Sequence, residues 1–235
     1  MTEMLAWLLI LLTTAAAPPA TTPSPASMTD AEALPATKAF ERWLEGTLGV
    51  ARGQHDVLVA SIEPDAVVVT FSAGSANPMS PTGGVARLRR SGSGWSVDRI
   101  YLEGPDLWVY PEAYVHDFQR RRAQRTMGEM RTLATAVESY SIDNNQYPVG
   151  TSPTDLEAAL EPTYIGRVPE RDGWGSPFLY VAEPSEYCVV SLGAGGEPDV
   201  PTPRDVHVLS KGAGASHDIS RDIVFCTGSF VSWYE

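Results

Sequence analysis

The chain has 235 residues, of which 43% are hydrophobic and 20% are charged. This composition is typical of a globular protein and excludes a disordered, collagen-like or multi-spanning membrane chain. The formal net charge of −12 argues against nucleic-acid binding, which requires a concentrated positive surface. The charge is unevenly spread, because residues 116–131 carry a net +3 and residues 132–235 a net −10.

The N-terminal segment combines an apolar run with small residues. Residues 4–12 are uninterruptedly apolar, and the small residues that follow extend the run to Ala17. The run is shorter than the ~20 residues that cross a bilayer as a helix, and its length is that of a secretory signal. We therefore predict that residues 1–17 are a signal peptide or an uncleaved anchor.

This segment also predicts the compartment. A signal peptide implies export to the periplasm or cell envelope. If residues 4–17 are not cleaved, they would anchor the chain to the inner membrane and would be its only membrane contact. Residues 18–35 are rich in Pro, Thr, Ser and Ala, which is typical of a solvated linker.

Residues 36–115 are predicted to form a small α+β domain of unknown type. A helix is expected over residues 36–50, where Phe40, Trp43 and Leu44 share one face. Four β-rich runs follow, separated by turn sequences: residues 56–62, 66–71, 85–90 and 95–102.

A long amphipathic helix is predicted over residues 116–145. Its apolar stripe repeats at the spacing of one helix face, through Met130, Leu133 and Val137. The helix ends before Pro148, because proline disfavours helical geometry in the residue that precedes it. Its first turns are basic at residues 120–125, which indicates either a solvated face or contact with anionic lipid or the acidic segment downstream.

The rest of the chain alternates short elements with turn-rich segments. A short helix is expected at residues 155–160, and residues 193–221 form a long polar loop. Strands are expected at residues 178–181, 187–192, 222–226 and 229–233.

The two cysteines of the chain, Cys188 and Cys226, each lie in a strand-like apolar run. In an oxidising compartment they would close a disulfide between antiparallel strands. The alternative is a pair of buried, reduced thiols that pack as small hydrophobic side chains.

Four segments resemble, in order and spacing, the C-terminal domain of type II secretion system protein G, the major pseudopilin. The first ends in Tyr-x-x-Asp-Asn-x-x-Tyr-Pro, and the second contains Trp-Gly-x-Pro. The segments are residues 130–148, 168–180, 190–196 and 221–225. The resemblance covers about residues 118–235 and implies a pilin-like domain over residues 116–235, with a long helix packed on a small antiparallel sheet. The fold class expected for the whole chain is therefore α+β.

The resemblance also implies a calcium site in the loop after the third segment. The family's first aspartate is replaced here by Gly195, whereas Asp222 matches the aspartate of its closing strand. Hard oxygen ligands are what Ca²⁺ requires, so the predicted ligands are the Leu192 carbonyl and the carboxylates of Asp199, Asp218 and Asp222, with Asp205 as a further substitute. The alternative is an acidic loop that only faces water.

The chain departs from the family near its N-terminus. The family's processing site and its long apolar helix, continuous with the globular domain, do not precede residue 118 in this sequence. The sequence therefore leaves open whether the protein enters a pseudopilus.

No catalytic motif is recognised, and no catalytic residue is predicted. Ser216, His217 and Asp218 are consecutive and cannot orient as a relay. A zinc site of the two cysteines with His207 and His217 lacks local ligand spacing.

We therefore expect a non-enzymatic envelope protein with a structural or protein-interaction role linked to secretion. Its partners would be proteins of the secretion apparatus or other envelope proteins. The alternative is a periplasmic ligand-binding module, in which the N-terminal domain binds a small molecule and the pilin-like domain is a scaffold.

Overall fold

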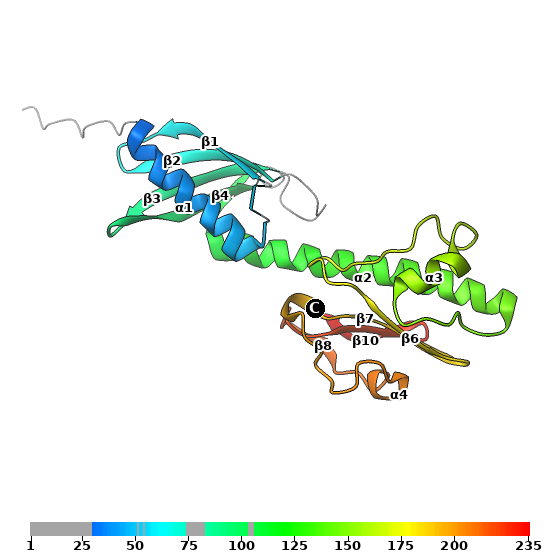
Figure 1. The fold of residues 1–235 in the computed structure, drawn as a ribbon. Helices are drawn as coiled ribbons and strands as arrows, with labels where there is room; N and C mark the ends of the chain where they lie inside the picture. The colour runs from blue at the N-terminus through cyan, green and yellow to red at the C-terminus, as the bar shows by residue number, and fades with distance from the viewer. Residues whose placement is uncertain (1–29, 51, 54, 74–82, 103–105) are drawn as a thin grey trace, which may run out of the picture.

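The structure is a computed structural model that describes residues 30–50, 52–53, 55–73, 83–102 and 106–235. The predicted signal peptide and residues 18–29 of the predicted linker lie outside these residues. The described chain forms two α+β lobes that share one long helix (Figure 1).

The first lobe is a helix packed on a five-stranded antiparallel sheet. The sheet is a meander in the order β1-β2-β3-β4-β5. Phe40, Leu44 and Leu48 of the helix are fully buried against sheet residues such as Val67 and Ile100. The elements are α1 (Asp30–Leu48), β1 (His55–Ile62), β2 (Ala66–Ala73), β3 (Gly84–Ser91), β4 (Gly94–Leu102) and β5 (Leu107–Val109).

Helix α1 begins at Asp30, earlier than the predicted start at residue 36. Pro35 lies inside it, although proline is disfavoured in a helix interior. Ala33 and Ala36 beside this proline are fully buried, so packing against the sheet compensates for the local preference.

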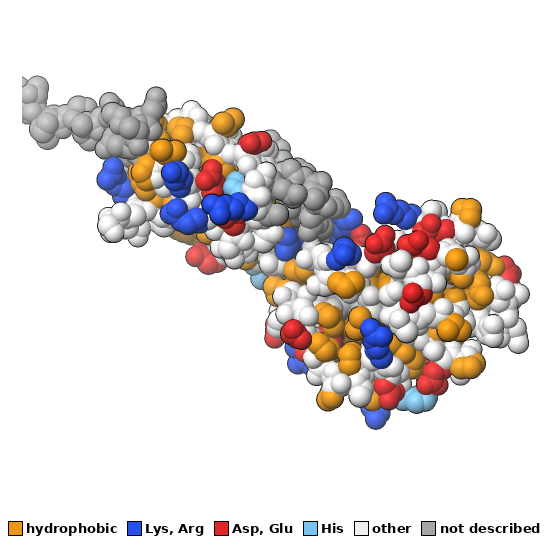
Figure 2. Space-filling model, in the orientation of Figure 1, with side chains coloured by type: hydrophobic (Ala, Val, Ile, Leu, Met, Phe, Trp, Pro, Cys, Tyr) orange, Lys and Arg blue, Asp and Glu red, His pale blue; other side chains and the backbone are white. Residues whose placement is uncertain are grey.

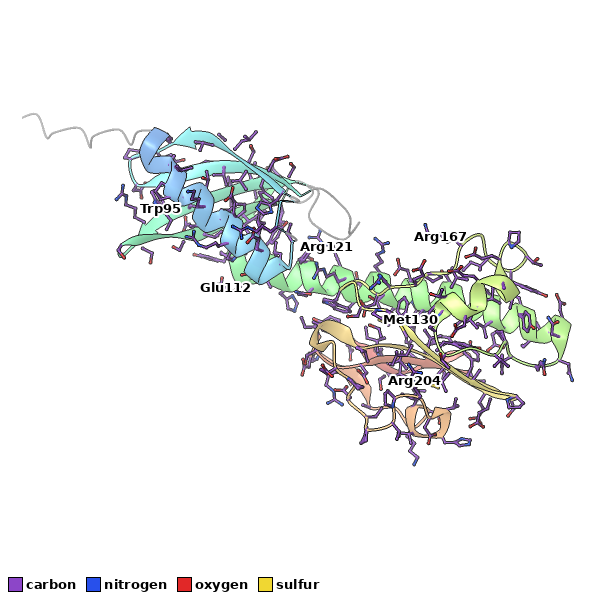
Figure 3. All side chains as sticks on the ribbon, viewed as in Figure 1. Trp95, Glu112, Arg121, Met130, Arg167 and Arg204 are labelled. Carbon is purple, nitrogen blue, oxygen red and sulfur yellow. A yellow bond between two sulfur atoms is a disulfide. The ribbon has the colours of Figure 1, made fainter. Side chains whose placement is uncertain are left out.

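Helix α2 (Pro111–Asn144) belongs to both lobes. Proline stands in its first turn, and Asn145 ends it in the left-handed conformation with φ 57°. Tyr114 and Phe118 are buried in the first core, whereas Met130 is buried in the second. Figure 3 shows Met130 between α2 and the second sheet. One continuous helix therefore connects the two cores.

The second lobe packs α2 and α3 (Pro153–Leu160) against a five-stranded sheet in the order β6-β7-β9-β10-β8. The pairs are antiparallel, except that β8 runs parallel to β10. The remaining elements are β6 (Leu179–Glu183), β7 (Glu186–Ser191), a 3₁₀ turn (Gly193–Gly195), α4 (Val206–Leu209), β8 (Gly214–Ser216), β9 (Ile223–Cys226) and β10 (Ser229–Tyr234). The α+β fold and the pilin-like packing are as the sequence predicted.

The predicted loop 193–221 contains two short elements, α4 and β8. The Asp205 carboxylate caps α4 by accepting hydrogen bonds from the backbone N–H groups of His207 and Val208. Val206 and Leu209 are buried beside Cys188. The prediction of a polar loop therefore overlooked one signal of a short helix, which is a capping aspartate followed by apolar residues.

None of the helices within the described ranges has both the length and the apolar character needed to span a bilayer.

Candidate functional site

The turn at Asp172 lies in the second of the segments that carry the resemblance. Asp172 is only 5% exposed, and its Oδ1 accepts hydrogen bonds from the backbone N–H groups of Trp174 and Ser176, both at 2.9 Å. Its Oδ2 accepts a hydrogen bond from Ser191 Oγ at 2.7 Å. Burial raises the pKa of Asp172, and these hydrogen bonds oppose the rise.

This turn packs directly on α2. The Gly173 N–H donates to Thr126 Oγ1 at 2.9 Å, and Trp174 Nε1 donates to Gln119 Oε1 at 2.8 Å. A Cβ at Gly173 would lie 2.7 Å from the backbone oxygen of Arg122. Since backbone cannot move aside easily, only glycine allows this approach. The motif therefore fixes the sheet against the middle of α2.

Arg122 connects the same turn of α2 to the first lobe. Its side chain is buried, and Nη2 donates to the carbonyl oxygen of Leu48, at the C-terminal end of α1, at 3.0 Å. The guanidinium lies 4.4 Å from the centre of the Phe118 ring. Burial lowers the pKa of Arg122, and the negative charge of Asp172 acts in the opposite direction.

The basic run of α2 therefore does not form a single solvated face. Arg121 pairs with Asp117 at 2.9 Å, and Arg125 pairs with Glu129 at 2.7 Å. Both pairs lie within the helix, at the (i, i+4) spacing that stabilises helices. Acidic side chains of the second lobe are scattered over its visible face, with apolar side chains among them (Figure 2). Within this run, the Arg122 charge interacts with that of Asp172 in the acidic segment.

The sequence-predicted carboxylates Asp199 and Asp222 come together. Each accepts a hydrogen bond from the other's backbone N–H at 2.9 Å, and Arg221 Nε donates to Asp199 Oδ2 at 2.8 Å. Asp222 is 5% exposed, and its Oδ1 is buried with no hydrogen-bond partner among the described residues. Burial raises the pKa of Asp222 to about 6, and the hydrogen bond from the Asp199 N–H opposes the rise.

The other two predicted calcium ligands are engaged elsewhere. The Leu192 carbonyl accepts a hydrogen bond from the Gly196 N–H at 3.1 Å, and Asp218 Oδ1 accepts hydrogen bonds from the backbone and side chain of Ser220. A Cβ at Gly195 would lie 2.5 Å from the backbone oxygen of Ser220, so no aspartate fits there in this arrangement.

The structure thus brings together two of the four predicted ligands, Asp199 and Asp222. Within the described ranges, no three His, Cys, Asp or Glu side chains are grouped so that they could hold a metal ion. The Arg221 guanidinium already supplies positive charge to Asp199. The partnerless Asp222 Oδ1 is the one feature that suits a cation. Calcium binding stays a prediction.

The two cysteines lie directly opposite each other on β7 and β9. Their Sγ atoms are 2.07 Å apart, which is the length of a disulfide bond. Cys188 and Cys226 are therefore joined to each other, which is incompatible with their serving as zinc thiolates. His207 of α4 lies beside Glu183 and Glu186 instead, and these two glutamates form the tip of the β6–β7 hairpin.

Part of the chain is similar to a known family. Residues 113–208 match the family model described as type II secretion system (T2SS), protein G. The match begins near the start of α2 and ends within α4, so it covers the elements that form the Asp172 turn. It supports a pseudopilin-like role in type II secretion for this domain. No curated protein and no solved structure matches the chain.

The match confirms the resemblance that the sequence motifs indicated, for part of the chain. It starts slightly before the expected residue 118 and stops before the closing strands. The segment 221–225, with Asp222, therefore lies beyond the matched residues.

Proposed function

We propose that this is a non-enzymatic protein of the cell envelope whose pilin-like domain makes protein–protein contacts in type II secretion. The observation that carries the proposal is the family match over residues 113–208. The matched family is one of structural proteins, and its members belong to the envelope. Its mode of action would therefore be binding to proteins of the secretion apparatus or to other envelope proteins.

The first lobe supports a role that differs from packing in a filament core. It covers the first turns of α2, because Tyr114 and Phe118 are buried in its core. Arg122 is hydrogen-bonded to the end of α1. These contacts would have to break before the start of α2 could pack against equivalent helices of other subunits. We infer that the first lobe presents the pilin-like domain to its partners as a fixed unit.

The Cys188–Cys226 geometry supports an extracytoplasmic location, since disulfides persist in oxidising compartments. We propose that the protein is exported to the periplasmic side of the envelope. Whether residues 4–17 are cleaved or retained as an anchor is a question for mass spectrometry of the mature chain.

Affinity purification from cells that carry a type II secretion system tests the proposal. The tagged full-length protein would be cross-linked in intact cells, purified from the envelope fraction and analysed by mass spectrometry. Enrichment of type II secretion proteins over an unrelated exported control is the expected result. A co-purified small molecule without any secretion protein would instead favour the ligand-binding alternative and contradict the proposal.

A further inference from the structure

A groove runs along α2 on the side of β10. It consists of two adjoining hollows of about 430 Å³ and about 280 Å³, and Tyr234 at the end of β10 lines both. Figure 1 shows the C-terminal end of the chain close to α2. The first hollow lies where the two lobes meet, and its walls include Trp43 of α1, Val115 of α2 and Ile219. Junctions between domains are common places for binding sites.

The second hollow has a different character. It is lined along α2 by Arg120, Gln124, Met127 and Arg131, which are spaced so that they follow one side of the helix. The first hollow is mostly apolar, although Glu112, His116 and His217 also line it. The second offers two guanidinium groups at its ends.

These two arginines differ from the others of the helix. Arg121 and Arg125 are neutralised by carboxylates on α2 itself. Arg120 and Arg131 have no carboxylate partner within the described part of the chain, although Arg131 lies over the Phe230 ring at 4.8 Å. In a chain of net charge −12, two unpaired arginines in one groove are the positive charge available to a ligand.

The spacing of Arg120 and Arg131 indicates the shape of that ligand. Eleven residues of α-helix correspond to about 16 Å along the axis. An extended peptide advances about 3.3 Å per residue, so carboxylates about five residues apart would reach both arginines. A single small anion would reach only one of them. Glu235 also lines the second hollow and would weaken the binding of such a peptide.

We propose that this groove binds an extended acidic segment of a partner protein. The carboxylates of the segment pair with Arg120 and Arg131, and a neighbouring aromatic or aliphatic side chain enters the hollow between Trp43 and Tyr234. Tryptophan, tyrosine and arginine are the residues most enriched at the energetic centres of protein interfaces. The inference rests on the proposed function only in that the ligand is a protein.

A peptide-binding assay with purified protein tests the inference. The probe is the fluorescein-labelled peptide Phe-Leu-Gly-Asp-Ser-Thr-Ser-Gly-Glu, together with the same sequence in reverse order, and the readout is fluorescence anisotropy. Control peptides carry Asn and Gln in place of the acidic residues, or Gly-Gly in place of Phe-Leu. We expect at least one orientation to bind, and both changes to weaken its binding.

Matched variants locate the site. Arg120→Gln combined with Arg131→Gln should weaken binding at least tenfold, which corresponds to about 1.4 kcal/mol. Arg121→Gln combined with Arg125→Gln removes the same charge from the same helix and should change binding less than twofold. Glu235→Gln should strengthen binding about twofold, because it removes the carboxylate that lines the second hollow. Thermal denaturation checks that each variant is folded.

Several outcomes would overturn the inference. One is the absence of binding to the wild-type protein, and another is equal weakening by the two double variants. Arginine-dependent binding to vesicles of anionic phospholipid, with no binding to the peptides, would assign the groove to membranes instead. The assay contains no secretion protein, so its failure leaves the co-purification result, and with it the proposed function, untouched.

Discussion

Reducing the disulfide between Cys188 and Cys226 is expected to destabilise the second lobe substantially. The two residues are 38 positions apart in sequence, and the segment between them contains the 3₁₀ turn, α4, β8 and the Asp199–Asp222 contact. Without the cross-link the unfolded chain gains the freedom of that loop. In the loop-closure model, a loop of this length corresponds to about 4 kcal/mol of unfolding free energy at 25 °C.

Urea denaturation of the oxidised and the dithiothreitol-reduced protein measures this difference. Reduction leaves both sulfur atoms in the buried cluster around Val190 and Leu209, so it isolates the effect of the cross-link. The double variant Cys188→Ala with Cys226→Ala also removes the packing of the two sulfur atoms, and it should be less stable than the reduced protein.

A difference below 1 kcal/mol between the oxidised and reduced forms would refute this reasoning. The same holds if alkylation and mass spectrometry find two free thiols in protein isolated from the periplasmic fraction. Such a result would restore the alternative of two buried thiols, and it would remove the support that the disulfide gives to export.

Three further changes test the site. The folded-state pKa of Asp222 is about 6, above its ordinary value of 3.8, because burial disfavours the charged carboxylate. The unfolding free energy should therefore fall as the pH rises from about 4 through 6, where Asp222 loses its proton in the folded protein. With a metal chelator present, Asp222→Asn should therefore raise the unfolding free energy at pH 7 by up to about 3 kcal/mol. It should also flatten the pH dependence of that free energy between pH 4 and 6. The same pH dependence in the variant and the wild type, measured by urea denaturation, would contradict this. Calcium at millimolar concentration should raise the melting temperature of the wild type but not of Asp222→Ala, and no rise in the wild type would end the calcium hypothesis. Gly173→Ala should lower the unfolding free energy by about 1–3 kcal/mol, because the new Cβ meets the backbone of Arg122. Gly128→Ala has open space around its Cβ and should raise the unfolding free energy by about 0.5–1 kcal/mol. Equal effects of the two changes would argue against the close approach at Gly173.

The long helix was predictable because its apolar stripe is local information. The residues Met130, Leu133 and Val137 fix both the helix and the face that it buries. The role of Arg122 was missed because it was grouped with the basic residues on either side. Its spacing of four from Phe118 and from Thr126 places it on the buried side of the helix, and that spacing was the available signal.

Features that depend on tertiary packing were less accessible. The apolar runs around Cys188 and Cys226 indicated two strands, but the register that places the cysteines opposite each other is set by the whole sheet. Of the predicted calcium ligands, Leu192 and Asp222 came from a family motif, and Asp199 and Asp218 were loop residues expected to substitute for its missing aspartate. The structure brings Asp199 and Asp222 together and adds Arg221 between the loops, whereas Asp218 caps its own turn. The unpaired state of Arg120 and Arg131 likewise depends on which carboxylates fold near them.

Site-specific photo-crosslinking in cells with an active type II secretion system tests the central claim most directly. A photoreactive amino acid would replace Gln124, which is exposed in the groove along α2, or Leu58, which is 67% exposed on the first lobe. We predict that position 124 cross-links to a protein of the secretion apparatus and that position 58 does not. The absence of any secretion protein at position 124, or equal capture from both positions, would contradict the account.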